Sequence, residues 1–187
     1  LINLEQLEEI FSIFKPEIVI HLAAQAGVRH SLVDPQSYLD SNVISFYNLL
    51  ECLKKSPVKK FVFASSSSVY GNSSKVPYSE SDKTSSPVSL YAATKKTNEV
   101  LAYSFAFNNS IPTIGLRFFT VYGPKGRPDM AYFKFADLIS SNKEMTIYNE
   151  GKMSRDMTYI DDIIQGLSKA VSFDSFASET PFEIFNL

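Results

Sequence analysis

Apolar residues recur along this chain in two rhythms, one typical of amphipathic helices and the other typical of buried strands. Over residues 1–14 they stand three or four positions apart, which predicts a helix that Pro16 closes. A short apolar run over 17–24 follows and has the composition of a strand buried on both faces. Pro35 then opens a long amphipathic helix, which we expect over 35–56.

The same alternation of strand and helix continues through the middle of the chain. Apolar runs over 59–64 and 113–119 predict two further buried strands, and a helix is expected between them over 89–108. Strands that alternate with helices pair in parallel, because each crossover carries the chain back to the same edge of the sheet. The pattern therefore favours an α/β fold with a doubly wound parallel sheet.

The last third of the chain is less regular. Two Gly and two Pro over 120–128 predict a loop, a helix is expected over 129–141, and residues 145–148 predict a short strand. The segment 152–159 is expected to be extended, and 161–173 has the pattern of a helix. These short elements indicate a second, smaller unit after the parallel sheet.

Composition and charge exclude several classes of function. The 187 residues are 44% hydrophobic with a formal net charge of −2, which fits one globular domain, or one and a part, without a basic surface for nucleic acid. No apolar run is long enough to span a membrane, and we find no secretory signal. Cys52 is the only cysteine, and His21 and His30 lack the spacing of metal ligands. We therefore expect no disulfide, no metal site and a cytoplasmic location.

Tyr91 and Lys95 stand four residues apart at the start of the third predicted helix. Residues at this spacing share a helix face, and a lysine beside a tyrosine lowers the pKa of the phenol, as a general base near neutral pH requires. Chance supplies about one such pair in a chain with 10 Tyr. A second pair, Tyr148 and Lys152, brackets a turn at 149–151, and we interpret it as accidental.

Small and polar residues follow three of the predicted strands at the point where each strand ends. The first strand ends in Leu22-Ala-Ala-Gln25, the second runs into four serines over 65–68, and the third is followed by Thr120. Taken singly, such residues are more often helix caps, packing residues or loop residues than site residues. Ligands of open parallel sheets bind beyond the carboxyl ends of the strands, so their joint order favours a shared ligand site.

Five ordered motifs give the chain a likeness to a known family. They are HLAAQAGVR at 21–29, SSSSVYG at 65–71, YAATK at 91–95, RFFTVYGP at 117–124 and RDMTYIDD at 155–162. With these motifs the chain resembles the extended short-chain dehydrogenase/reductase family, specifically its NAD-dependent sugar-nucleotide epimerases. The subgroup that it resembles most is that of the UDP-glucuronate 4-epimerases. The resemblance covers nearly the whole chain.

The resemblance implies an isomerase that uses NAD and acts on a UDP-sugar by transient oxidation at C4. It implies that Tyr91 is the catalytic base, that Lys95 lowers its pKa and holds the nicotinamide ribose, and that Ser66 or Ser67 binds the sugar 4-hydroxyl. The expected reaction converts UDP-glucuronate to UDP-galacturonate for surface polysaccharide precursors. Tyr91 and Lys95 are also implied to contact the cofactor, together with Leu22, Ala23, Ala24, Gln25, Asn42, Ser65 and Phe118. Further substrate contacts are implied for Arg29, Thr120, Arg127 and Arg155, with Arg155 on the diphosphate and Thr120 on the hexuronate carboxylate.

The family organisation implies two units and a dimer. Residues 1–119 would form part of a Rossmann-like NAD-binding domain, and residues 120–187 part of a smaller sugar-nucleotide-binding domain, with helix 161–173 packed back on the first. Members of the family commonly pair through two helices, here 35–56 and 89–108, so a homodimer is expected. The glycine-rich phosphate loop of the family does not occur in the sequence. We therefore expect a fragment, incomplete at its N-terminus, that alone neither holds NAD tightly nor turns over.

Other functions remain open at this point. A 4-epimerase of a neutral UDP-hexose or UDP-N-acetylhexosamine is the nearest alternative. A sugar-nucleotide 4,6-dehydratase is disfavoured because Ser67 and Ser68 stand where those enzymes carry an Asp-Glu pair. A non-catalytic NAD-binding protein is disfavoured because the chain keeps the tyrosine, the lysine and the serine hydroxyl.

Overall fold

The computed structural model describes residues 1–147, 149–152 and 154–187 of the chain. Its strands are β1 (Ile18–His21), β2 (Lys60–Ser66), β3 (Thr113–Phe118), β4 (Thr120–Tyr122), β5 (Met157–Tyr159) and β6 (Phe182–Asn186). Its α-helices are α1 (Leu4–Phe14), α2 (Pro35–Tyr38), α3 (Ser45–Lys55), α4 (Leu90–Asn109), α5 (Ala131–Ser140) and α6 (Ile160–Ser172). Shorter helices are the 3₁₀ segments η1 (His30–Leu32), η3 (Ser67–Tyr70) and η4 (Asn149–Gly151) and the π-helical turn η2 (Leu39–Ile44).

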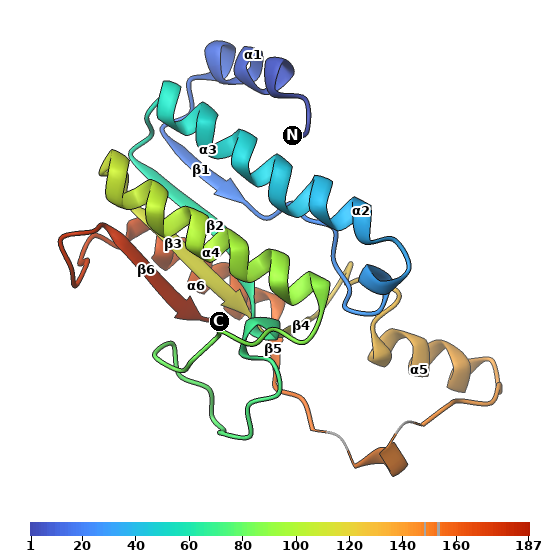
Figure 1. The fold of residues 1–187 in the computed structure, drawn as a ribbon. Coiled ribbons are helices and arrows are strands. Elements are labelled where there is room, and N and C mark those ends of the chain that lie inside the picture. Colours follow the sequence, from blue (N-terminus) through green and yellow to red (C-terminus); the bar gives the residue numbers. More distant parts are fainter. Residues whose placement is uncertain (148, 153) are drawn as a thin grey trace.

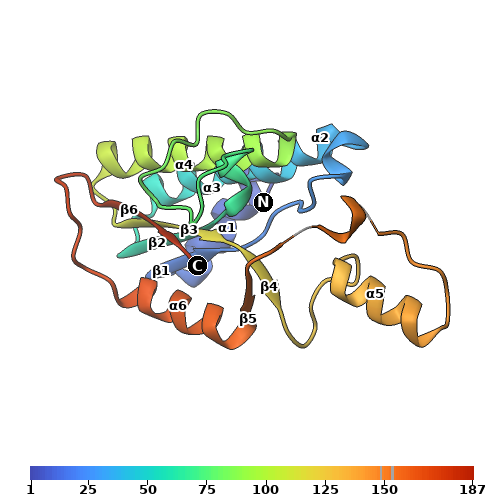
Figure 2. The same cartoon turned by 90° about the horizontal axis from the view of Figure 1, so that it is seen from below.

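Within the described residues, four parallel strands form the main sheet in the order β1-β2-β3-β6. Figures 1 and 2 show that α3 and α4 lie on one face of this sheet and that α6 lies on the other. Strands β4 and β5 pair in parallel in a separate small sheet. Because helices cover both faces of a parallel sheet, the predicted doubly wound α/β fold is confirmed.

Both faces of β2 are buried, which explains its unbroken apolar pattern. Phe61 and Phe63 point toward α3 and α4 and join a core cluster with Phe46 and Leu53. Val62, between them, packs on the opposite face with residues of β3 and α6. Successive side chains of a strand alternate between its two faces, so a strand covered on both sides needs apolar residues at every position.

Several predicted elements begin or end elsewhere in the structure. The predicted strand over 17–24 stops at His21, whereas the second strand continues into the serine run as far as Ser66. Pairing explains both limits, because β1 has partners in β2 only up to His21, while β2 has partners in β3 up to Ser66. The predicted helix over 35–56 is continuous but contains the π-helical turn η2 between α2 and α3.

The region after β3 departs further from the predictions. The predicted loop over 120–128 begins with β4, whose partner β5 lies far along the chain and leaves no local trace in the sequence. Residues 145–147 of the strand predicted over 145–148 form no strand, and Tyr148 lies outside the described residues. The helix predicted over 161–173 corresponds to α6, which packs on the main sheet.

Helix α5 projects away from the layered part of the molecule (Figure 1), and none of its residues is buried. The segment predicted to be extended over 152–159 ends in β5, and its Met153 lies outside the described residues. Among the helices that the structure describes, none has both the length and the apolar character needed to cross a membrane.

Candidate active site

A cavity of about 470 Å³ lies beyond the carboxyl ends of β2 and β3. Figure 1 shows that α4 begins at this edge of the sheet. This is the edge at which open α/β sheets bind their ligands. Six of the predicted site residues line it together, namely Ser66, Ser67, Tyr91, Phe118, Thr120 and Arg127. Residues that are up to 61 positions apart in the sequence therefore share one cavity.

Tyr91 lies in the first turn of α4, where the Ser89 hydroxyl caps the helix by accepting a hydrogen bond from the Ala92 N–H at 3.1 Å. Its ring is half-buried and stands edge-on to Tyr38 at a centroid distance of 6.2 Å. Burial raises the pKa of the Tyr91 hydroxyl above its ordinary value, while a hydrogen bond with Ser66 lowers it in part.

The structure corrects the predicted effect of Lys95 on that pKa. The Lys95 ammonium donates a hydrogen bond to the Ala64 carbonyl at the end of β2, at 2.7 Å, and is 3% exposed. Burial lowers the pKa of Lys95 to about 8. The pKa of Tyr91 is raised, because burial of the phenol outweighs the hydrogen bond with Ser66 and the charge of Arg127, which both lower it. A helical spacing of four could not reveal that packing, since it says nothing of the strand beneath the helix.

The serine run over 65–68 ends β2 and begins the 3₁₀ helix η3. Ser66 ends β2 and caps η3, where its hydroxyl accepts a hydrogen bond from the Ser68 N–H at 3.2 Å. Gly71 closes this turn with a φ of 62°, and a Cβ there would meet the Ser86 carbonyl oxygen at 2.5 Å. Ser66 is thus held both in the sheet and in the turn, next to Tyr91.

Asn42, for which a cofactor contact is predicted, makes three hydrogen bonds within the protein. Its side-chain oxygen accepts from the Gln25 N–H at 2.8 Å, and its amide donates to the Gln25 carbonyl at 3.0 Å and to Thr94 Oγ1 at 3.1 Å. These bonds use both amide hydrogens of a side chain that is 1% exposed. Asn42 therefore ties the loop after β1 to α4. This loop lines a second cavity of about 330 Å³ with Ala23, Ala24 and Gln25.

Four other predicted residues lie outside both cavity linings. The Ser65 hydroxyl donates to Glu99 at 2.6 Å and is buried, and the cofactor contact predicted for Ser65 stays a prediction. Leu22 is 49% exposed, and Arg29 is an exposed residue that precedes η1. Arg155 is exposed and donates to the Ser154 carbonyl at 2.9 Å.

Arg127 lies in the cavity lining and is held by a neighbour that the sequence reasoning missed. Its guanidinium donates to both carboxylate oxygens of Asp129, at 2.8 and 2.6 Å. The buried pair of Glu99 and Arg117 was not predicted from the sequence either. A signal was present, because Glu99 follows Lys95 by four residues on the helix and Arg117 interrupts an otherwise apolar strand.

Comparison with known proteins gives consistent matches along the whole chain. The model of the NAD dependent epimerase/dehydratase family matches residues 1–187. A probable UDP-glucuronate 4-epimerase of Rhizobium meliloti is 50% identical over 161 residues, which cover 86% of this chain and 47% of that protein. The chain spans about half the length of the curated relatives that it matches.

Two solved structures resemble the chain closely. The UDP-glucuronic acid 4-epimerase of Bacillus cereus, in complex with UDP-glucuronic acid and NAD, has a TM-score of 0.85 and 38% identity, over 96% of this chain and 55% of that one. The UDP-N-acetylglucosamine 4-epimerase of Methanobrevibacter ruminantium, in complex with UDP-N-acetylmuramic acid, has a TM-score of 0.87 and 30% identity. That match covers 99% of this chain and 59% of the other.

Proposed function

The chain belongs to the NAD-dependent epimerase/dehydratase family, and we propose that it carries the catalytic residues of a UDP-sugar 4-epimerase that uses NAD. The observation that carries this proposal is the meeting of Tyr91 and Ser66 in one cavity at the carboxyl edge of the sheet. We propose that residues 1–119 contribute to the cofactor domain and 120–187 to the domain that binds the sugar nucleotide. The reaction would take place in the cytoplasm.

The residues at this edge fit the cofactor. Lys95 makes one hydrogen bond within the described part of the chain, and an ammonium has three donors, so two remain for a ribose. The small side chains of Ala23 and Ala24 leave room for a flat ligand in the second cavity. NAD, when bound, would supply the acceptor and later the donor of a hydride, together with a positive charge that lowers the pKa of Tyr91.

Tyr91 would act as the base in the first half of the reaction. Its phenolate takes the proton of the sugar 4-hydroxyl while the hydrogen at C4 leaves as hydride, which produces a ketone at C4. Ser66 orients the 4-hydroxyl, because it is fixed by β2 and by the turn of η3. After the sugar turns over, hydride return to the other face and proton return from Tyr91 give the opposite configuration at C4.

We propose UDP-glucuronate as the substrate and UDP-galacturonate as the product, which would serve as a precursor of surface polysaccharide. The hydroxyls of Ser66, Ser67 and Thr120 line the same cavity and can donate hydrogen bonds to a hexuronate carboxylate. The matches to UDP-glucuronate 4-epimerases support this choice. A neutral sugar is the second candidate, because the UDP-N-acetylglucosamine 4-epimerase is equally similar in fold.

A substrate panel tests the proposal. The complete gene product would be incubated with UDP-glucuronate, UDP-glucose or UDP-N-acetylglucosamine, and the products would be separated by chromatography. We expect conversion of UDP-glucuronate, and we expect Thr120→Val to slow this conversion while Ser141→Ala, a change in an exposed residue after α5, does not. Turnover of a neutral sugar alone would replace the substrate, and no turnover of any of them would refute the epimerase.

We also propose that the protein is a homodimer that pairs through α3 and α4. These helices lie side by side on one face of the sheet (Figure 1). Their outer sides expose large apolar residues, among them Tyr47 at 49%, Tyr103 at 50% and Phe107 at 65%. A second copy of the same two helices would cover these side chains.

A further inference from the structure

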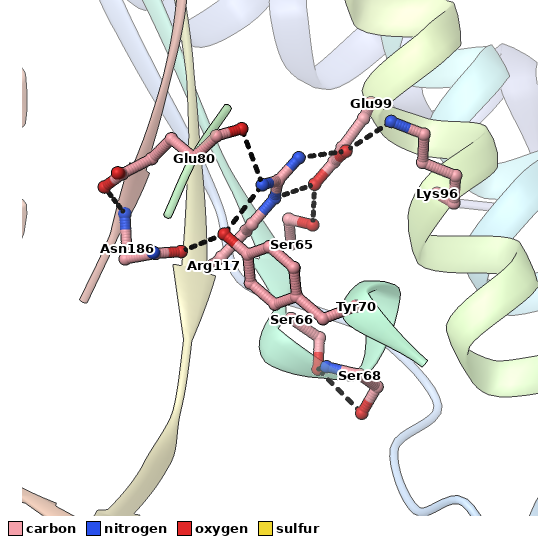
Figure 3. A network of polar contacts seen from close by, with 9 residues as sticks. All are labelled: Ser65, Ser66, Ser68, Tyr70, Glu80, Lys96, Glu99, Arg117 and Asn186. Atoms are coloured by element: carbon pink, nitrogen blue, oxygen red, sulfur yellow. Dashed lines mark hydrogen bonds and ion pairs between the residues drawn. The ribbon is translucent and has the colours of Figure 1, made fainter. Parts of the chain in front are cut away.

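A buried network of polar side chains lies next to the serine turn of the candidate site (Figure 3). At its centre Arg117 of β3 donates to Glu99 of α4 through Nε at 2.8 Å and through its Nη2 atom at 3.0 Å. The two side chains are 4% and 2% exposed. A bidentate ion pair of this kind fixes the distance and the angle between the guanidinium and the carboxylate, because both groups are planar.

The carboxylate of Glu99 is fully engaged in this network. Besides the two bonds from Arg117, it accepts a bond from the Ser65 hydroxyl at 2.6 Å and one from the Lys96 ammonium at 3.0 Å. A buried charge without partners is costly, so all these donors have to be in place at once. The network therefore tolerates little sliding of α4 along the sheet.

Arg117 reaches the other end of the serine turn. Its Nη1 atom donates to the Tyr70 hydroxyl at 2.8 Å, and its guanidinium carbon lies 4.9 Å from the centre of the Tyr70 ring. The Tyr70 hydroxyl in turn donates to Asn186 of β6 at 2.7 Å. Ser65 and Tyr70 flank the turn that contains Ser66, so the ion pair holds this turn from both sides (Figure 3).

The same pair is connected to the base. Glu99 follows Lys95 by one helical turn and Tyr91 by eight residues on α4, and Ser65 directly precedes Ser66 on β2. We infer that Glu99 and Arg117 are positioning residues that set the separation between the Ser66 and Tyr91 hydroxyls, an inference that rests on the proposed epimerase function. An apolar contact at this place would hold the helix on the sheet but would not define its position along the strand, because apolar packing has no direction.

The test compares Glu99→Gln and the milder Ser65→Ala with a matched control elsewhere on β2. Lys60 begins this strand, is 5% exposed and donates to the Val171 carbonyl at 2.9 Å, so Lys60→Gln also removes a polar contact of a buried side chain but does so far from the cavity. The complete gene product would be assayed for kcat, KM and the pH dependence of kcat, with the thermal midpoint measured for each variant.

We expect Glu99→Gln to lower kcat at least about tenfold with KM within about twofold, because misplaced reacting groups slow the chemical step more than they weaken binding. The acid limb of the kcat profile should move to higher pH, since the hydrogen bond with Ser66 lowers the pKa of Tyr91. Ser65→Ala should show the same changes to a smaller degree, and Lys60→Gln should change the thermal midpoint only.

The outcomes separate this inference from the proposed function. Wild-type turnover with an unchanged kcat and pH profile in Ser65→Ala and Glu99→Gln would overturn the inference alone. The inference would also be overturned if Lys60→Gln and Glu99→Gln had similar thermal midpoints and lost kcat equally. Both losses would then result from lowered stability. If the wild type is inactive, the epimerase proposal fails, and a crystal structure of Ser65→Ala decides the inference through the separation of Ser66 and Tyr91.

Discussion

Replacing Tyr91 by Phe is the most direct perturbation of the proposed chemistry. The substitution removes one hydroxyl and keeps the ring, which stands edge-on to Tyr38 at 6.2 Å. Loss of the phenol hydroxyl, which shares the cavity lining with Ser66, is expected to lower the free energy of unfolding by about 0.5–1.5 kcal/mol. In a chain of this size each kcal/mol shifts the thermal midpoint by about 2–4 °C, so the variant should stay folded at 25 °C.

The effect on turnover should be much larger. A positioned general base contributes about 10²–10⁴-fold to a rate, so kcat of Tyr91→Phe should fall by this factor. Retention of NAD should be unchanged, because the cofactor contacts proposed for Lys95 and Gln25 do not involve the Tyr91 hydroxyl. The assay is chromatography of the UDP-sugars, together with the absorbance of the nucleotide released on denaturation.

A control variant and the pH dependence of kcat test the role of the Tyr91 hydroxyl further. Tyr103→Phe changes the same residue type on the same helix at a position 50% exposed, and it should leave kcat unchanged. Because the base is the phenolate, kcat should rise with pH through the pKa of Tyr91, and Ser66→Ala should move that rise to higher pH. If Tyr91→Phe kept more than about a tenth of the wild-type kcat, the role assigned to this hydroxyl would be wrong.

Three further perturbations follow from the packing. Lys95→Met should abolish turnover yet stabilise the fold at pH 7 by up to about 3 kcal/mol, because burial lowers the pKa of the lysine from 10.5 to about 8. In urea titrations the native chain should gain this stability between pH 8 and 10.5, where only the unfolded state binds the proton, and an equal rise in the variant would contradict the account. Glu99→Gln should cost about 3–5 kcal/mol at pH 7, whereas the double change Glu99→Leu with Arg117→Met should cost far less, because no buried charge is left unpaired. Burial raises the pKa of Glu99, but hydrogen bonds led by that from Arg117 outweigh it and hold the pKa below 4.5. The stabilisation by this pair should therefore be present above pH 4.5 and lost as the pH falls below it. Equal stability above and below that pH would refute the pairing. Phe107→Glu on α4 should give a monomer by light scattering while Ile139→Glu on α5, 66% exposed, keeps the dimer, and a dimeric Phe107→Glu protein would exclude this interface.

Three strands of the main sheet, β1, β2 and β3, were predictable because their signals are local. The apolar runs over 59–64 and 113–119 identify strands that are buried on both faces, and the helices between them carry a helical period. The end of β2 at Ser66 was not predictable, because it depends on the partner residues that β3 offers. Strand β4 was missed for the same reason, since its partner β5 is more than thirty residues away.

Several residues that line the candidate site were predictable, whereas their interactions were less so. Motif order indicated Tyr91, Ser66, Thr120 and Arg127, and all four line one cavity. The expected low pKa of Tyr91 was wrong, because a pKa depends on burial and on every neighbouring charge. The hydrogen bonds of Asn42 with Gln25 and Thr94 were not predictable either, because a buried amide takes the partners that packing brings to it.

The sequence by itself determined the order of strands and helices as far as β3, the placement of polar residues at the strand ends and the identity of the proposed base. These follow from hydrophobic periods and from residue types, which are properties of short stretches of chain. Only the tertiary structure decided that Glu99 and Arg117 meet, and that Ser65 and Tyr70 join them around the serine turn. Partners of buried polar groups come from separate elements, and which groups meet is settled by how a helix and strands pack on one another.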